Sequence, residues 1–148
     1  TGVDSVVFLF SANKNAALQN IAEVASGGEI SRIMLSLKSI IAAAKALPTL
    51  IFDEIDTGVS GTIAARMADI MEEIASHGRQ VISITHLPQI AAKGTAHYKV
   101  YKEDTDTATV SHMRRLTTEE RINELAQMMS AGSLTEAAIN NAREMLGL

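Results

Sequence analysis

Residues 49–54 of the chain read Thr-Leu-Ile-Phe-Asp-Glu, and the fold can be inferred outward from this stretch. Leu50–Phe52 is apolar without alternation, which is typical of a strand covered on both faces, as in a parallel sheet. A second strand of the same kind is predicted at Val81–Thr85. Between the two strands, apolar residues recur at helical spacing across residues 63–74, and Gly78 ends that segment. Strand, helix and strand with short connections predict a right-handed parallel crossover and therefore an α/β fold.

The upstream segments extend this unit. Apolar positions three and four residues apart predict a helix that runs from about Ile30 to Lys45 and ends before Pro48. The predicted buried face of this helix consists of Ile30, Ile33, Met34, Leu37, Ile40, Ile41 and Ala44. The β-branched and aromatic stretch 2–10 predicts an opening strand, and the polar stretch 11–15 predicts a loop.

The downstream segments have a different character. Residues 98–102 and 107–113 alternate around an acidic turn, which predicts an antiparallel hairpin at a sheet edge. A capping box at 117–120 predicts a helix that ends at Gly132, and a last helix is expected over residues 134–146. The expected architecture is a mostly parallel sheet with an antiparallel hairpin at one edge and flanking helices.

Length and composition limit the possible classes. The chain has 148 residues, of which 47% are hydrophobic and 20% charged, so it is one ordinary domain or one lobe of a larger one. A net charge of −4 argues against a phosphate-binding basic surface as the organising feature. The absence of cysteine excludes disulfide scaffolds, thiolate metal sites and cysteine nucleophiles. No membrane-spanning run or signal peptide is visible, and the start at Thr1 suggests a piece of a longer polypeptide.

Polar residues follow both predicted parallel strands. Asp53 and Glu54 end the first strand, and His86 follows the second. Because ligands of open α/β sheets gather at the carboxyl ends of the strands, all three are expected on one rim. One carboxylate there can hold Mg²⁺, its neighbour can deprotonate an attacking water, and the histidine can bond a terminal phosphate oxygen. The rim therefore has the outline of a phosphoryl-transfer site.

Ser26, Gly27 and Gly28 precede the first long helix and form a second candidate element. Free amides at a helix N-terminus attract anions, and glycine lets a phosphate approach the main chain closely. Ser26 with Glu29 is also a good capping box, so capping without further function is the simpler interpretation of this element alone. The Asp-Glu pair and the lone histidine likewise have simple structural interpretations, but all three elements in this order are much less probable by chance.

Taken together, these elements resemble an ABC-type ATPase. The stretch Ala-Ser-Gly-Gly-Glu at 25–29 resembles the signature motif, residues 49–54 resemble the Walker B strand, and His86 resembles the switch histidine. Residues 56–61, Asp-Thr-Gly-Val-Ser-Gly, occupy the place of the D-loop but differ from the common Ser-Ala-Leu-Asp. The stretch 24–89 is similar to the carboxy-terminal lobe of SMC-like ATPases of bacterial DNA repair.

The resemblance implies a role for each residue. Asp53 would position Mg²⁺, Glu54 would be the catalytic base and His86 would contact the γ-phosphate of ATP. The signature residues Ser26, Gly27, Gly28 and Glu29 would bind ATP held by a second head, with Ser26, Gly27 and Gly28 at its γ-phosphate. Asp56 and Ser60 are candidates for the D-loop residue that crosses to the partner site.

The phosphate-binding loop Gly-x-x-x-x-Gly-Lys-[Ser/Thr] and any long heptad region are absent from the sequence. In the family that the chain resembles, the loop belongs to an amino-terminal lobe beyond a coiled coil. Residues 1–148 are therefore expected to form a single carboxy-terminal lobe that hydrolyses no ATP alone. The implied partners are its amino-terminal lobe, a second head in a homodimer and DNA, with no membrane, in the nucleoid-associated cytoplasm of a bacterium.

Two other functions stay open from the residues. A receiver-like signalling module would use Asp53, Glu54 and Thr85, but it needs a further acidic pair that Asp4 alone does not supply. A non-catalytic interaction domain on a nucleotide-binding fold would make Glu54 dispensable. DNA contact rests on the resemblance, because Lys99, Lys102, Arg114 and Arg115 are more simply explained as solvated charges.

Overall fold

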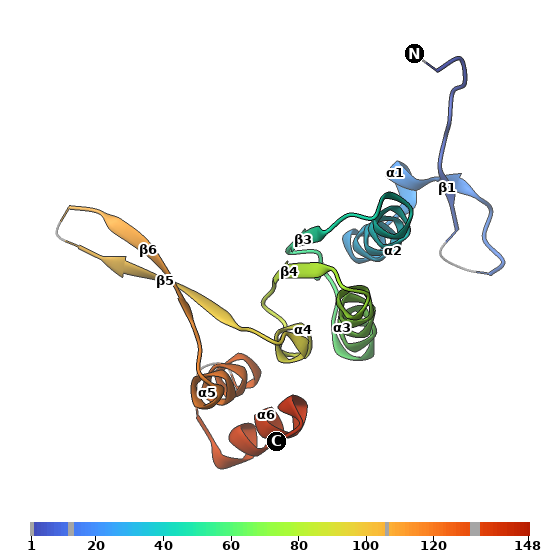
Figure 1. Cartoon of the computed structure of the whole chain (residues 1–148). Helices are drawn as coiled ribbons and strands as arrows, with labels where there is room; N and C mark the ends of the chain where they lie inside the picture. The colour runs from blue at the N-terminus through green and yellow to red at the C-terminus, as the bar shows by residue number, and fades with distance from the viewer. Residues whose placement is uncertain (1, 12–13, 106, 131–133) are drawn as a thin grey trace.

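The computed structural model describes residues 2–11, 14–105, 107–130 and 134–148. Within this part the chain forms helices and three two-stranded sheets (Figure 1). In chain order the elements are β1 Leu9–Phe10, β2 Gln19–Asn20, α1 Ile21–Val24, α2 Gly27–Lys45, β3 Thr49–Asp53, α3 Gly61–Ser76, β4 Gln80–Ile84, α4 Pro88–Lys93, β5 Tyr98–Asp104, β6 Thr109–Arg115, α5 Thr118–Met129 and α6 Glu136–Leu146.

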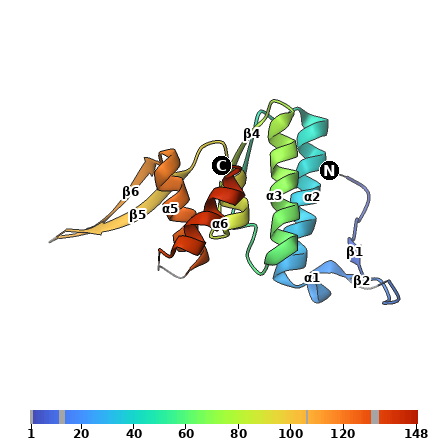
Figure 2. The same ribbon diagram turned by 90° about the horizontal axis from the view of Figure 1, so that it is seen from below.

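The strand–helix–strand unit predicted from the sequence is present. Strands β3 and β4 pair in parallel, from Thr49 opposite Gln80 to Asp53 opposite Ile84. Helices α2 and α3 run side by side, as both views show (Figures 1 and 2). The α/β class and the parallel crossover are therefore confirmed.

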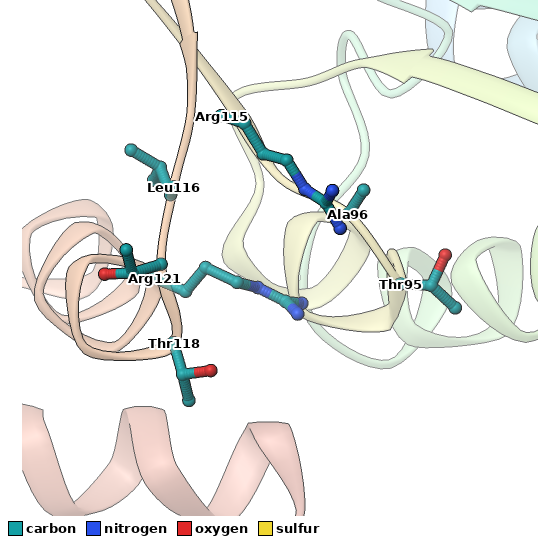
Figure 3. A pocket seen from close by; sticks show the side chains of 7 residues that line it. Thr95, Ala96, Arg115, Leu116, Thr118 and Arg121 are labelled. Carbon is teal, nitrogen blue, oxygen red and sulfur yellow. The ribbon is translucent and has the colours of Figure 1, made fainter.

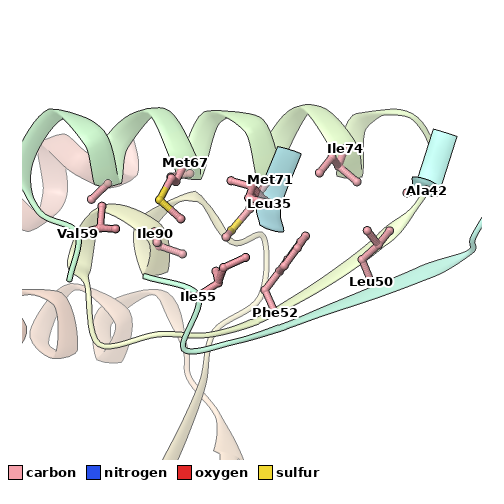
Figure 4. Packing of buried hydrophobic residues seen from close by; sticks show 12 residues of the cluster. Leu35, Ala42, Leu50, Phe52, Ile55, Val59, Met67, Met71, Ile74 and Ile90 are labelled. Atoms are coloured by element: carbon pink, nitrogen blue, oxygen red, sulfur yellow. The ribbon is translucent and has the colours of Figure 1, made fainter. Parts of the chain in front are cut away.

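The main core lies between the parallel pair and these two helices (Figure 4). Leu50 and Phe52 of β3 point into it, and Phe52 is fully buried against side chains such as Met67 and Met71 of α3. The expectation that β3 is covered on both faces is wrong for this chain, because Ile51 is 57% exposed on the opposite face. Exposed isoleucines of β4, Ile82 and Ile84, complete that uncovered face.

Helix α2 differs from the prediction in the same way. Leu35 and Ala42, seven residues apart and thus on one side of the helix, are buried in the core. Six members of the predicted buried face are exposed instead: Ile30, Met34, Leu37, Ile40, Ile41 and Ala44. The apolar periodicity identified the helix correctly, but not the side that packs against α3.

The beginning of the chain also differs. Of the strand expected over residues 2–10, only Leu9 and Phe10 pair, antiparallel with Gln19 and Asn20. The preceding Val3–Phe8 are exposed and unpaired with any other strand within the described residues. A β-rich composition does not form a strand where no neighbour supplies hydrogen bonds. Residues 12–13 of the expected loop lie outside the described residues.

The carboxy-terminal part forms a second body of helices and a hairpin. Strands β5 and β6 pair antiparallel, from Tyr98 opposite Arg115 to Asp104 opposite Thr109. The second strand begins and ends two residues later than the predicted range 107–113. The hairpin forms its own sheet and projects away from the helices, rather than extending the parallel pair (Figures 1 and 2). Helix α4, absent from the prediction, separates β4 from β5 in the chain.

Helices α5 and α6 enclose a smaller core that includes Ile122, Leu125 and Ala142. The expected capping box of α5 is present, with Thr117 and Glu120 as its two members. The expected stop at Gly132 lies outside the described residues. No helix in the described part of the chain is both long and apolar enough to traverse a bilayer.

Candidate functional site

Asp53 and Glu54 lie at the carboxyl end of β3, where both side chains are exposed. Asp53 is opposite Ile84, so His86 follows two residues beyond the partner of Asp53. The amide of Glu54 donates to the carbonyl of Ile84 at 3.0 Å, which extends the pairing by one bond. The structure therefore brings the two predicted carboxylates and the histidine to one rim.

Glu54 has a φ of 47°, in the left-handed region that non-glycine residues adopt infrequently. Its carbonyl accepts hydrogen bonds from the amide and hydroxyl of Thr57, at 3.1 and 2.9 Å. The carbonyl of Asp56 accepts from the amide of Val59 at 3.0 Å. These bonds fold residues 54–60 back from the rim as a compact loop, which we call the rim loop.

Asp56 does not extend outward from the rim loop. It is fully buried, and its Oδ2 accepts a hydrogen bond from the hydroxyl of Thr85 and lies 3.7 Å from Nδ1 of His86. This position makes Asp56 an unsuitable candidate for the residue that crosses to a partner. Ser60 is exposed at the start of α3 and makes no side-chain capping bond, so it is the better candidate.

The sequence Ser26 to Glu29 forms the N-terminal turn of α2. The Ser26 amide and hydroxyl both donate to Oε2 of Glu29, at 2.8 and 2.7 Å, and the Glu29 amide donates back at 3.4 Å. The hydrogen bond from the Ser26 backbone is the main reason that the pKa of Glu29 is lowered. The structural capping interpretation of this motif is thus correct, and Ser26 and Gly27 remain exposed for any further contact.

Gly28 joins this turn to the rim loop. It is buried, and a Cβ at its position would lie 2.7 Å from the carbonyl oxygen of Gly58. Gly58 has a φ of 75°, which uses the conformational freedom of glycine, whereas Gly28 contributes the absence of a side chain. The motif at 26–29 is therefore held against the rim loop although the two are distant in sequence. The contact made by Gly58 and the hydrogen bond from Thr85 to Asp56 were not predicted from the sequence, which placed Gly58 only within the stretch 56–61 and gave Thr85 a functional role only in the receiver-like alternative.

The residues that the structure describes do not form a complete metal site of their own. In the described ranges no three His, Asp or Glu side chains converge in a way that could hold a metal ion. Mg²⁺, however, usually keeps several waters and binds one or two carboxylates together with phosphate oxygens. Asp53, an exposed carboxylate at the strand end, fits such a partial site.

A cavity of about 470 Å³ lies elsewhere, between the α4–β5 connection and the start of α5 (Figure 3). It is lined by Thr95, Ala96, Arg115, Leu116, Thr117, Thr118 and Arg121. Its Arg121 donates to the carbonyls of Ala92 and Gly94, at 3.3 and 2.6 Å, so this guanidinium secures the end of α4. None of the predicted site residues lines this cavity.

Two of the four hairpin cations that were interpreted as solvated charges are paired with carboxylates. Lys99 pairs with Glu124, and Arg114 pairs with Glu120 at 2.5 Å. Glu120 also belongs to the capping box of α5, and the backbone bond from Thr117 is the main reason that its pKa is lowered. Solvated or paired charges therefore explain these residues without a nucleic-acid ligand.

Comparison with known proteins finds relatives that are similar to this chain in sequence. No family model matches it. The DNA repair protein RecN of Deinococcus radiodurans is 45% identical over 145 residues, and that of Bacillus subtilis is 40% identical over the same length. Each alignment includes 98% of this chain and 25% of the relative, so the chain spans about a quarter of the length of the relatives it matches.

Solved structures that match this chain in fold include heads of SMC proteins. The Smc head of Pyrococcus yayanosii matches with a TM-score of 0.64 and 27% identity, over 79% of this chain and 21% of that one. A structure from work on ATP-driven dimerization and DNA-stimulated activation of SMC ATPases matches with a TM-score of 0.58 and 25% identity, over 78% of this chain and 68% of that one. The chain therefore matches the carboxy-terminal region of the DNA repair protein RecN in sequence and the SMC ATPase head in fold.

Proposed function

We propose that this chain is the carboxy-terminal lobe of an SMC-like ATPase head that acts in DNA repair, and that its rim is one part of a composite ATP site. The observation that carries the proposal is the parallel register of β3 and β4. It puts Asp53 opposite Ile84 and so brings Asp53, Glu54 and His86 to one edge of the sheet. The similarity to RecN proteins and to SMC ATPase heads supports ATP as the nucleotide.

Each rim residue has a distinct task in this proposal. Asp53 would hold Mg²⁺, which when bound neutralises charge on the β- and γ-phosphates. Glu54 would accept the proton of the attacking water, and its exposed carboxylate at the strand end is open to such a water. His86, whose side chain is 64% exposed, would donate a hydrogen bond to a γ-phosphate oxygen.

The N-terminal turn of α2 would act on a different nucleotide. Gly27 is exposed, a Cβ at its position would meet no atom within 4 Å, and Ser26 beside it is exposed as well. The helix N-terminus there favours an anion such as a γ-phosphate. In the proposed homodimer, Ser26, Gly27 and Gly28 of one head bind ATP held by the other head, and Glu29 fixes the turn through its bonds to Ser26.

The rest of the head would come from the remaining three-quarters of the longer protein. An amino-terminal lobe with the phosphate-binding loop would supply the amide cradle and lysine that this sequence lacks. The uncovered isoleucines of β3 and β4 and the exposed apolar side of α2 are suitable surfaces for that lobe. DNA binding, and with it association with the nucleoid, would be a property of the whole protein.

The substitution Glu54→Gln in the full-length protein tests the proposal. Removing only the base should lower ATP turnover by ~100-fold or more while nucleotide-driven pairing of heads persists. This chain alone should hydrolyse no ATP in the same assay. Turnover that survives Glu54→Gln would instead favour a non-catalytic interaction domain.

A further inference from the structure

Asp56 is the one charged side chain that is buried among the residues that the structure describes, with 0% of its surface exposed. A buried carboxylate is costly unless hydrogen bonds compensate the loss of hydration. The rim loop would not need a buried carboxylate at position 56 if its function were only to reverse the direction of the chain. The contacts of Asp56 therefore bear on what it does.

The first contact fixes how the carboxylate is used. The Thr85 hydroxyl oxygen accepts a hydrogen bond from the amide of Leu87 at 2.9 Å and donates its proton to Oδ2 of Asp56. Because a hydroxyl has a single proton, this pair of bonds commits Asp56 to the role of acceptor. Through these two bonds, Thr85 links the carboxylate of Asp56 to the backbone of Leu87, just beyond the end of β4.

The second carboxylate oxygen is left without a donor. Oδ1 of Asp56 is buried and has no hydrogen-bond partner among the described residues. Nδ1 of His86 lies 3.7 Å from Oδ2, which is within ion-pair range but longer than a hydrogen bond. The exposed His86 ring needs to move by only about 1 Å to donate to the carboxylate.

We infer that Asp56 is a positioning residue for His86: it accepts a hydrogen bond from Nδ1 and so directs Nε2 outward at the rim. This inference rests on the proposed function, in which His86 contacts the γ-phosphate. When both ring nitrogens carry a proton, Nδ1 donates to Asp56 and Nε2 donates to a phosphate oxygen. This positioning role replaces the expectation that Asp56 itself crosses to the partner site. It also connects the rim loop to His86.

The direct test is nuclear magnetic resonance of this chain with ¹⁵N-labelled histidine, which identifies the ring nitrogen that carries the proton. We expect neutral His86 to carry its proton on Nδ1 and to lose that preference in Asp56→Asn. The matched control is Glu103→Gln, because Glu103 lies 3.2 Å from Nε2 of the other carboxylate-paired histidine, His112. That variant should alter His112 and leave His86 unchanged.

Two outcomes would overturn the inference. One is a wild-type His86 that carries its proton on Nε2, which decides the question even where Asp56→Asn does not fold. The other is an Asp56→Asn chain with native amide spectra and an unchanged His86. A buried carboxylate needed only for folding would produce this second result.

Kinetics of the full-length protein separate this inference from the proposed function. Asp56→Asn should lower kcat by ~10- to 100-fold with an unchanged KM for ATP, as is typical when the partner of a functional side chain is removed. Glu103→Gln should leave both constants unchanged. The two claims can therefore fail separately. If Asp56→Asn changes the protonation of His86 but Glu54→Gln leaves ATP turnover unchanged, the positioning role of Asp56 stands and the ATPase assignment is refuted.

Discussion

The backbone of Gly28 lies directly against the carbonyl of Gly58, so closely that a Cβ on Gly28 would be 2.7 Å from the Gly58 oxygen. Gly28 is the second residue of α2 and Gly58 belongs to the rim loop, so this contact joins the two motifs that the proposed function assigns to different nucleotides. It gives a physical route by which occupancy of one site can affect the loop beside the other.

Gly28→Ala should therefore destabilise the chain. The obstructing atom is backbone and cannot rotate away, so either α2 or the rim loop must shift, at a cost of about 1–3 kcal/mol in the free energy of unfolding. Gly27→Ala is the matched control, because a Cβ there meets nothing within 4 Å. Urea unfolding of both variants measures the difference. Equal stabilities would contradict the close contact.

Ser26→Arg should block the pairing of heads in the full-length protein. Ser26 is exposed at the N-terminus of α2, and a large cation there would add bulk and charge to the proposed interface. Ser76→Arg is the control, since Ser76 is exposed at the far end of α3 from the rim loop. Sedimentation in the presence of ATP distinguishes the two. Paired heads with Ser26→Arg would show that the signature assignment is wrong.

Glu29→Gln should reduce the dependence of stability on acid. The folded pKa of Glu29 is lowered by the Ser26 backbone bond, so the unfolded state binds more protons in the window below the ordinary glutamate value of about 4.3. The stabilisation is thus present above that value and is lost as pH falls through the lowered pKa.

Glutamine keeps the capping geometry but does not titrate. Unfolding midpoints at pH 7 and pH 3 should differ less in Glu29→Gln than in the wild type. Glu119→Gln is the control, because Glu119 lies in the first turn of α5 but is not part of its capping box. A change of the same size in both variants would argue against a specific role of the Ser26 bond.

Ile82→Lys should reduce the binding of a separately produced amino-terminal lobe. Ile82 is 42% exposed on the uncovered face of β4, where a lysine leaves the core of the chain intact but interrupts the apolar surface. Met113→Lys is the control, because Met113 is 69% exposed on the hairpin instead. Titration calorimetry with each variant compares the affinities. Unchanged affinity for Ile82→Lys would exclude this face as the docking surface.

Several features of the fold and site could be predicted from local sequence. Apolar runs, helical spacing and the capping pattern at 117–120 are properties of adjacent residues, so they located β3, β4, α3 and α5. The order of strand, helix and strand then implied parallel pairing, and that pairing placed Asp53 and His86 at one edge. The chemistry of the rim thus followed from residue type and topology.

Other features were decided only by tertiary structure. An apolar stripe shows that a surface avoids water, but not which partner covers it, and so the predicted face of α2 is exposed while Leu35 and Ala42 pack in the core. The burial of Asp56 depends on the left-handed turn at Glu54, which folds the rim loop back beneath His86, and no sequence pattern indicated that turn. Local pattern is set by residues close in sequence, whereas burial depends on contacts between residues that are distant along the chain.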